Sequence, residues 1–331
     1  MTRLNTLLIG CNYDDCSMNP GTERTCRERH ASLQLYFRKA FVGIALTLSI
    51  QCLPVQGQET PANAAAALQA KRIELQPQLR SNPFHEPLHL SSRQENKRVE
   101  GDIHAEVANP FAEVTAAFKS AATVCELLLL HLNVRACHPA GGAGNETVTL
   151  ALGPKRALTS GELYHVTYAL RIEAAGPAYF RATMRAPKGP LGTRDYRILV
   201  EAMPIGDKRS FVHMGYSYGY GAMAKMAMDL YLATAGRAKI GFTITGRSPE
   251  GKPVYVGGER GSLERNVMRY YLALLAYSSI TTGSPQEKMT ARLRKWFALT
   301  ERYPAQLHEL NLDEYLEEKY GELAKSGFPM K

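Results

Sequence analysis

The stretch that decides the fold is GDIHAEVANPFAEVTAAF, residues 101–118 of the 331-residue chain. Polar and apolar residues alternate through GDIHAEVA, which places Ile103, Ala105 and Val107 on one face, as in a half-buried strand. Pro110 ends the strand, because proline cannot donate to the hydrogen-bond ladder of a sheet. Apolar residues at helical spacing follow and predict a helix over residues 111–131.

Downstream of this helix, six strand candidates are separated by turn sequences such as AGGAGN, AAGP and PIGDK. Short strands at this density predict an antiparallel meander. The period of two is clearest between residues 164 and 172. The candidate strands cover residues 132–137, 147–152, 164–174, 178–186, 195–203 and 209–221.

The rest of the chain predicts further helices. Residues 223–236 have helical character. KIGFTITG at 239–246 reads as one more strand, and PVYVGG is expected to extend the sheet. A long helix is expected over residues 262–280, where a broad apolar stripe indicates burial. Residues 285–327 read as amphipathic helices packed outside the core.

This order resembles the helix-grip fold of the START-like, or SRPBCC, superfamily. The resemblance is carried by residues 101–118, by the meander from Tyr164 to Tyr220 and by the helix from Ser262 to Ile280. It implies an α+β domain in which an antiparallel sheet wraps around the long C-terminal helix, with a cavity between them for a lipid, sterol or polyketide-like ligand. The superfamily includes transfer proteins, cyclases and hydrolases, so the resemblance does not select an activity.

The N-terminal part is typical of an exported bacterial protein. AFVGIALTLSI at residues 40–50 follows two basic residues and is too short to span a membrane, which needs about 20 residues as a helix. This is the pattern of a secretory signal peptide. Val55 and Gly57 would occupy the cleavage positions and leave Gln58 as the first mature residue.

Residues 1–34 precede this signal and are interpreted as lying upstream of the true start of translation. The rival interpretation is a short metal-binding arm, although Cys11, Cys16 and Cys26 lack the paired spacing of zinc sites. A lipid anchor on Cys52 is the alternative to soluble export, and Gln51 argues against it, because a lipidated cysteine normally follows a small residue. The predicted organisation is residues 1–57 as extension and signal (35–57 the signal proper), 58–99 as tail and lead-in, 100–282 as the helix-grip domain, and 283–331 as a C-terminal helical extension.

After cleavage the only cysteines are Cys125 and Cys137. An oxidising compartment favours a disulfide between them, and two separately buried thiols are the alternative.

GYSYGYG at residues 215–221 is the first candidate for a binding surface. In a strand the three tyrosines share one face and the glycines the other. The hypothesis is an aromatic cavity wall, to which Tyr168 would add, and the alternative is packing against a helix. The tyrosines are Tyr216, Tyr218 and Tyr220.

SLERNVMRYY is the second candidate. Arg265 and Arg269 lie one helical turn apart, as do Asn266 and Tyr270. If the helix caps a cavity, these side chains could anchor an acidic head group. The alternative is a solvated helix face.

His213 lies on the strand of the tyrosines and is predicted with them as a ligand-binding residue, and it is also a candidate general base. The alternative is a hydrogen-bonded structural histidine. No SxxK pattern is present, and we assign no catalytic residues, no metal and no cofactor from the sequence.

The net charge is +9, and the basic residues are scattered. This predicts no nucleic-acid binding and allows a weak peripheral contact with anionic membranes. The leading hypothesis is non-catalytic binding or carriage of a lipid-like molecule in the periplasm or outside the cell. The alternatives are an enzyme, such as a cyclase or hydrolase acting on an apolar substrate, and an envelope module that binds a protein partner.

Overall fold

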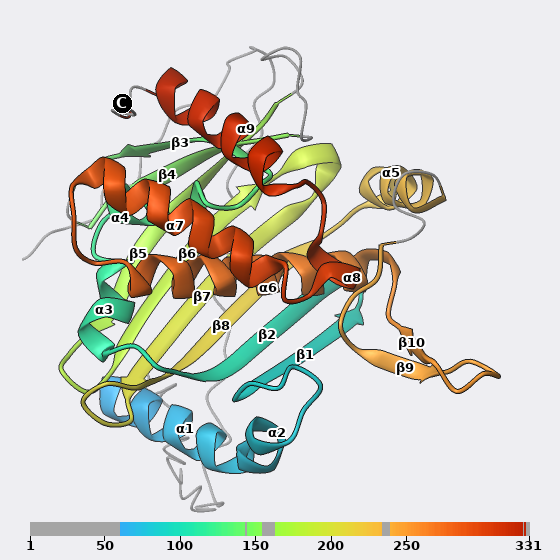
Figure 1. Cartoon of the computed structure of the whole chain (residues 1–331), viewed down its shortest axis with the longest axis horizontal. Coiled ribbons are helices and arrows are strands. Elements are labelled where there is room, and N and C mark those ends of the chain that lie inside the picture. Colours follow the sequence, from blue (N-terminus) through green and yellow to red (C-terminus); the bar gives the residue numbers. More distant parts are fainter. Residues whose placement is uncertain (1–59, 143, 154–162, 234–238, 327, 329–331) are drawn as a thin grey trace, which may run out of the picture. The chain divides into compact units, whose positions relative to one another are not determined.

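An eight-stranded antiparallel sheet forms the centre of the folded part (Figure 1). The computed structural model describes residues 60–142, 144–153, 163–233, 239–326 and 328. The strand order is β1-β2-β8-β7-β6-β5-β4-β3. The strands are β1 (Leu88–Glu95), β2 (Arg98–Val107), β3 (Val134–Ala140), β4 (Thr147–Leu152), β5 (Tyr164–Ala175), β6 (Phe180–Lys188), β7 (Arg194–Pro204) and β8 (Ser210–Gly219).

The chain leaves β2, passes through two short helices and returns as a meander that ends with β8 beside β2. The register pairs Ile103 with Met214 and Gly101 with Tyr216. Side chains on one face of these strands are buried against the helix α6 (Gly258–Ser279), which runs across the sheet. At the crossing, a Cβ on Gly101 would lie 3.0 Å from Leu263 Cδ2, so glycine lets α6 approach β2 closely. This is the predicted helix grip.

Three helices follow α6; the first two pack on it, and the third packs on the first and on β3 (Figure 1). Two of them begin with a capping box, formed by Ser284 and Glu287 in one case and by Asn311 and Glu314 in the other. Trp296 is 1 % exposed and donates from its indole nitrogen to the Arg269 carbonyl, which fixes this layer on α6. The helices are α7 (Pro285–Thr300), α8 (Pro304–Leu307) and α9 (Leu312–Lys325).

The single helix predicted over residues 111–131 is two helices, α3 (Phe111–Ala116) and α4 (Ala121–Leu128). Ser120 starts the second one, because its hydroxyl accepts from the backbone of Thr123 in a capping box. Serine favours caps over helix interiors for this reason. Cys125 of α4 and Cys137 of β3 are joined by a disulfide, with their Cα atoms 5.4 Å apart.

Residues 239–258 do not extend the main sheet, which corrects that prediction. β9 (Ile244–Arg247) and β10 (Pro253–Tyr255) pair only with each other. In the chain, α5 (Ala222–Ala233) follows β8 and precedes this hairpin.

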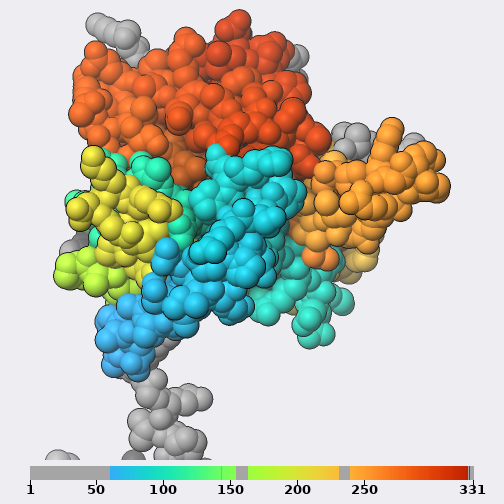
Figure 2. Space-filling model, turned by 60° about the horizontal axis from the view of Figure 1, so that its bottom comes forward, coloured from blue at the N-terminus to red at the C-terminus, as the bar shows by residue number. Residues whose placement is uncertain are grey.

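The segment read as a tail and lead-in is folded from Pro61 onward. Helices α1 (Pro61–Glu74) and α2 (Gln76–Arg80) pack on the outer face of the sheet, and β1 forms its edge. In the space-filling view the blue residues of α1 and α2 lie against the strands, away from the orange and red layer of α6–α9 (Figure 2). A small apolar cluster, separate from the core around α6, joins these helices to the sheet and consists of Ala64, Leu68, Leu75, Leu79, Tyr179, Met203 and Phe211.

The predicted signal peptide and its upstream cysteines lie outside the described residues. Among the helices of the described ranges, none is long and apolar enough to cross a membrane.

Candidate functional site

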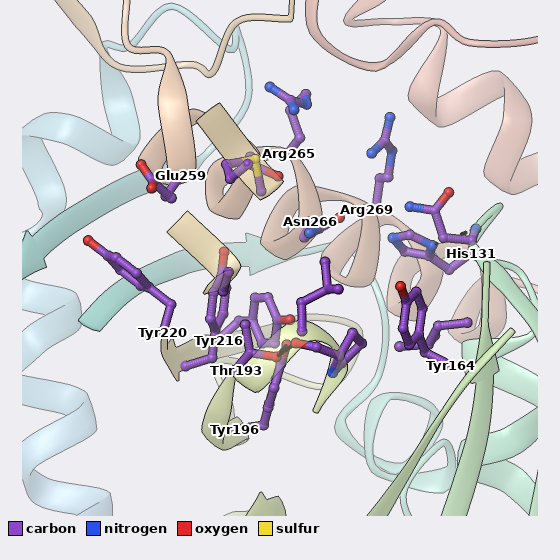
Figure 3. Close-up of a pocket in the computed structure, with 18 of the residues that line it drawn as sticks. His131, Tyr164, Thr193, Tyr196, Tyr216, Tyr220, Glu259, Arg265, Asn266 and Arg269 are labelled. Carbon is purple, nitrogen blue, oxygen red and sulfur yellow. Dashed lines mark hydrogen bonds between the residues drawn. The ribbon is translucent and has the colours of Figure 1, made fainter. Parts of the chain in front are cut away.

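A cavity of about 650 Å³ lies between the sheet and α6 (Figure 3). Strands β5, β7 and β8 form one wall, α6 forms the opposite wall, and α5 with the turn at residues 190–193 closes one side. Seven of the eight ligand-binding residues predicted from the sequence line it: Tyr168, Tyr216, Tyr218, Tyr220, Arg265, Asn266 and Arg269.

Tyrosine rings make up most of the sheet wall. Tyr196 of β7 stacks on Tyr218 at 5.2 Å between ring centroids, and Tyr168 meets Tyr196 edge-on at 6.2 Å. Tyr216 reaches Tyr270 of α6 at 5.5 Å, so the rings are continuous from the sheet to the helix. The alternation GYSYGYG produces this wall, because every second side chain of β8 faces inward.

The tyrosine hydroxyls stay protonated and give the wall its polar groups. Burial raises the pKa of Tyr168 and Tyr216 well above the usual value and also raises the pKa of Tyr218 and Tyr270. None of these four hydroxyls has a hydrogen-bond partner in the part of the chain that the structure describes. The wall therefore offers apolar ring faces together with neutral donors.

The two arginines of α6 line the cavity but also hold neighbouring segments. Arg265 donates to the Ile240 carbonyl at 3.2 Å. Arg269 donates to Glu309 at 2.6 Å and to the Leu307 carbonyl at 3.4 Å. Both side chains are almost fully buried, so the alternative of a solvated helix face is wrong. These bonds attach the segment around Ile240 and the segment that follows α8 to α6.

Four ionisable lining residues other than tyrosines were not predicted from the sequence: His131, Lys239, Glu259 and Glu309. Lys239 and Arg269 share the carboxylate of Glu309, which follows α8 and lies 40 residues from Arg269 in the chain. His131 follows α4; its ring contacts Tyr270 of α6, and its carbonyl accepts from Lys319 of α9. These residues come from separate segments with no motif, so nothing in the local sequence marks them.

His213 does not face the cavity. It projects from the opposite face of β8 between two carboxylates, with Nδ1 2.7 Å from Glu201 and Nε2 2.8 Å from Asp102. Gly215 makes room for this pair, because a Cβ there would lie 3.0 Å from Asp102 Oδ1. The prediction of His213 as a ligand-binding residue is therefore corrected. Side chains alternate along a strand, so His213 and Tyr216, three residues apart on β8, point to opposite faces of the sheet.

Burial acts to lower the pKa of His213, but the bonds to Asp102 and Glu201 outweigh it and raise the pKa to about 9. The ring of His104 stacks on it at 4.2 Å and stays neutral, since burial lowers its pKa to about 3. A raised folded-state pKa stabilises the fold below the unfolded value of about 6.5, and this contribution is lost as pH rises through 9.

We therefore expect the free energy of unfolding to fall by about 2–3 kcal/mol between pH 6.5 and pH 10 through this group. The measurement is urea unfolding across that range in wild type and in His213→Gln, in which the loss over this range should be smaller by that amount. Parallel pH profiles for the two proteins would contradict the assignment.

Among the described residues, no group of three or more His, Cys, Asp and Glu side chains could hold a metal ion.

No family model matches this sequence, and no curated protein matches it. Solved structures that resemble the chain include the ZhuI aromatase/cyclase from Streptomyces sp. R1128, with 16 % identity over 57 % of this chain and 92 % of that chain and a TM-score of 0.33. A START superfamily protein from Mycobacterium smegmatis covers 45 % of this chain and 92 % of its own, with 11 % identity and a TM-score of 0.28. Norcoclaurine synthase from Thalictrum flavum, in complex with dopamine and hydroxybenzaldehyde, shows 14 % identity over 43 % of this chain and 82 % of its own, with a TM-score of 0.30.

At these TM-scores the likeness adds no weight of its own, and the strand order with α6 across the sheet decides the fold. The fold is an α+β helix grip. Relative to the simplest grip, the chain adds α5, the β9–β10 hairpin and the layer α7–α9 after the meander. Two of these additions, α5 and the segment after α8, supply residues to the cavity.

Proposed function

We propose that this START-like protein binds or carries a hydrophobic, lipid-like molecule in its cavity without transforming it. The observation that carries the proposal is the cavity of about 650 Å³ walled by tyrosines. Ligand pockets for small molecules fall in this size range and combine apolar walls with a few polar groups. Apolar surface buried there contributes about 25 cal/mol per Å² before the ordering of the ligand is counted.

The two alternatives receive less support from the same geometry. The enzyme hypothesis named His213 or a nearby tyrosine as the acid–base group. His213 lies on the other face of the sheet, engaged by Asp102 and Glu201. The tyrosines do line the cavity, but burial raises their pKa and makes them poor bases. The interaction-module hypothesis expects the space inside the grip to be filled by the protein's own side chains. The cavity volume favours a small-molecule ligand instead.

The test is native mass spectrometry of the protein and of its solvent extract, with a variant that fills the cavity. Ala227 of α5 lines the cavity, whereas the neighbouring Met226 is 69 % exposed. Wild type and Met226→Trp are expected to carry or take up one hydrophobic molecule per chain. Ala227→Trp should lose at least about nine-tenths of this occupancy, because an indole occupies the ligand volume. An empty wild-type protein with no lipid uptake would reject the proposal.

We propose further that the protein works outside the cytoplasm and touches a membrane surface. The signal-like residues 35–57 and the net charge of +9 support this, as do the exposed Met223 and Met226 on α5 beside the cavity. Cell fractionation with N-terminal sequencing should find a form beginning at Gln58. Sedimentation with anionic liposomes should carry the protein down at low salt. A cytosolic, unprocessed protein would contradict export, and a protein that stays in the supernatant with liposomes would contradict membrane contact.

A further inference from the structure

His131 is buried at the cavity wall with its protonation fixed by its neighbours. The backbone N–H of Asn133 donates to His131 Nδ1 at 3.1 Å, so Nδ1 carries no proton and Nε2 carries it. Burial, followed by the nearby Arg269 and Lys319 charges, holds the pKa of His131 well below its usual range. The imidazole is therefore neutral and presents one N–H donor.

That donor meets no acceptor at full hydrogen-bond geometry among the described residues, and its polar side-chain neighbour there is Asn266, whose weaker interaction with the imidazole acts to raise the pKa of His131. Nε2 of His131 is buried without such an acceptor, and the whole residue is 2 % exposed. A buried donor without an acceptor destabilises a protein, so such a group calls for an explanation. The ring itself is held in place by Tyr270 at 5.0 Å and by Trp296 at 6.3 Å between centroids.

Asn266 lies beside His131 on the same side of the cavity, as Figure 3 shows, and its side chain acts to raise the pKa of His131. The Asn266 side chain is half-buried and lines the cavity. An amide offers two further donors. Together the two side chains present neutral donors at the α6 end, opposite the apolar ring faces of the sheet wall.

The charge of the lining favours an anionic acceptor at this place. The described lining holds three cations, Lys239, Arg265 and Arg269, and two carboxylates, Glu259 and Glu309. Arg269 and Lys319 act on His131 more strongly than Glu309 does, so the local potential at this imidazole favours an anion, and in a site of low dielectric this matters more than in water. The two oxygens of a carboxylate can accept from two neighbouring donors.

We propose that His131 and Asn266 bind the carboxylate of a hydrophobic acid, whose apolar body lies along the tyrosine wall. The inference rests on the proposed function and adds the chemical class of the ligand. In this arrangement His131 donates through Nε2 and takes no proton, so it positions the ligand and does not act as a base. Carboxylate binding completes the hydrogen bonding of a side chain that is otherwise buried without an acceptor.

The test compares four ligands with the same apolar body: hexadecanoic acid, its methyl ester, hexadecanol and hexadecyl phosphate. Trp296 is the only tryptophan of the chain and lies against His131, so its fluorescence reports occupancy of this end of the cavity. Titration calorimetry on the full chain gives the affinities. Wild type is expected to bind the acid about ten- to hundredfold more tightly than the ester or the alcohol.

His131→Phe and Asn266→Leu should each remove most of this preference for the acid, so that the acid and the alcohol bind with similar affinities. His131→Gln should retain it, because the glutamine amide can place a donor near the position of Nε2. His165→Phe is the matched control at an exposed histidine on the outer face of β5. Asn266→Leu keeps the test decisive if His131→Phe does not fold.

Equal binding of acid and alcohol by the wild type, or an acid preference that survives in both His131→Phe and Asn266→Leu, would overturn the inference while the proposed function stands. Tighter binding of hexadecyl phosphate than of the acid would overturn the assignment to a carboxylate. Failure of all four ligands, together with an empty protein in mass spectrometry, would instead reject the proposed function.

Discussion

Replacing Glu264 with alanine is expected to lower the free energy of unfolding by about 3–5 kcal/mol. This carboxylate of α6 is fully buried. It accepts from the backbone of Phe242 at 2.6 Å and of Thr243 at 2.9 Å, and from the hydroxyls of Thr243 and Ser92. Alanine would leave these buried donors without an acceptor, so both the helix and the segment that leads into β9 lose their attachment.

The measurement is urea unfolding of Glu264→Ala beside Glu317→Ala, an exposed glutamate on α9 that should change stability by less than about 0.5 kcal/mol. Ligand occupancy should fall in Glu264→Ala as well, since Lys239 and Ile240 precede the attached segment. Equal stability of the two variants would show that the Glu264 bonds contribute nothing net.

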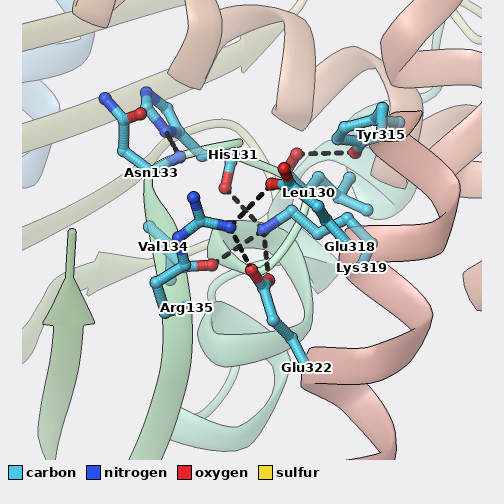
Figure 4. Close-up of polar contacts among 9 residues, drawn as sticks. All are labelled: Leu130, His131, Asn133, Val134, Arg135, Tyr315, Glu318, Lys319 and Glu322. Atoms are coloured by element: carbon cyan, nitrogen blue, oxygen red, sulfur yellow. Dashed lines mark hydrogen bonds and ion pairs between the residues drawn. The ribbon is translucent and has the colours of Figure 1, made fainter. Parts of the chain in front are cut away.

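The second large effect is expected for Lys319→Met, with a loss of about 3 kcal/mol. Lys319 of α9 is 1 % exposed and donates to the carbonyls of His131 at 2.9 Å and Val134 at 2.7 Å (Figure 4). It also pairs with Glu322, which Arg135 contacts from β3. Methionine would remove one partner and leave buried acceptors without their donor.

Because these bonds hold the segment that carries His131, Lys319→Met should also weaken binding of a hydrophobic acid. Lys325→Met, at the exposed end of the same helix, is the control and should leave both stability and binding unchanged. A thermal midpoint of Lys319→Met within a degree or two of that of Lys325→Met would reject this role of α9.

Local patterns predicted the parts of the fold that depend on one segment at a time. The alternation in residues 215–221 placed three tyrosines on the cavity face, and the apolar stripe of residues 262–280 predicted the buried helix α6. Two predictions were wrong because a helix cap or a local strand pairing overrides the hydrophobic pattern. Ser120 divides the helix predicted over 111–131, and residues 244–255 pair with each other instead of with the sheet.

The donor pair at the cavity could not be predicted, because its chemistry depends on contacts between distant segments. The state of His131 is set by the Asn133 backbone, by Arg269 of α6 and by Lys319 of α9. Those charges lie 138 and 188 residues away in the chain, and sequence spacing carries no information about them.

Local sequence patterns were sufficient to predict the strands of the meander, the buried helix α6 and the tyrosine wall. Periodicity suffices for these, since side-chain direction follows from backbone geometry within one element. Only the tertiary structure decided which polar groups meet in the cavity. The neighbours of a buried histidine set its pKa and decide whether its N–H finds an acceptor. In this protein those neighbours come together only when the sheet, α6 and α9 have packed.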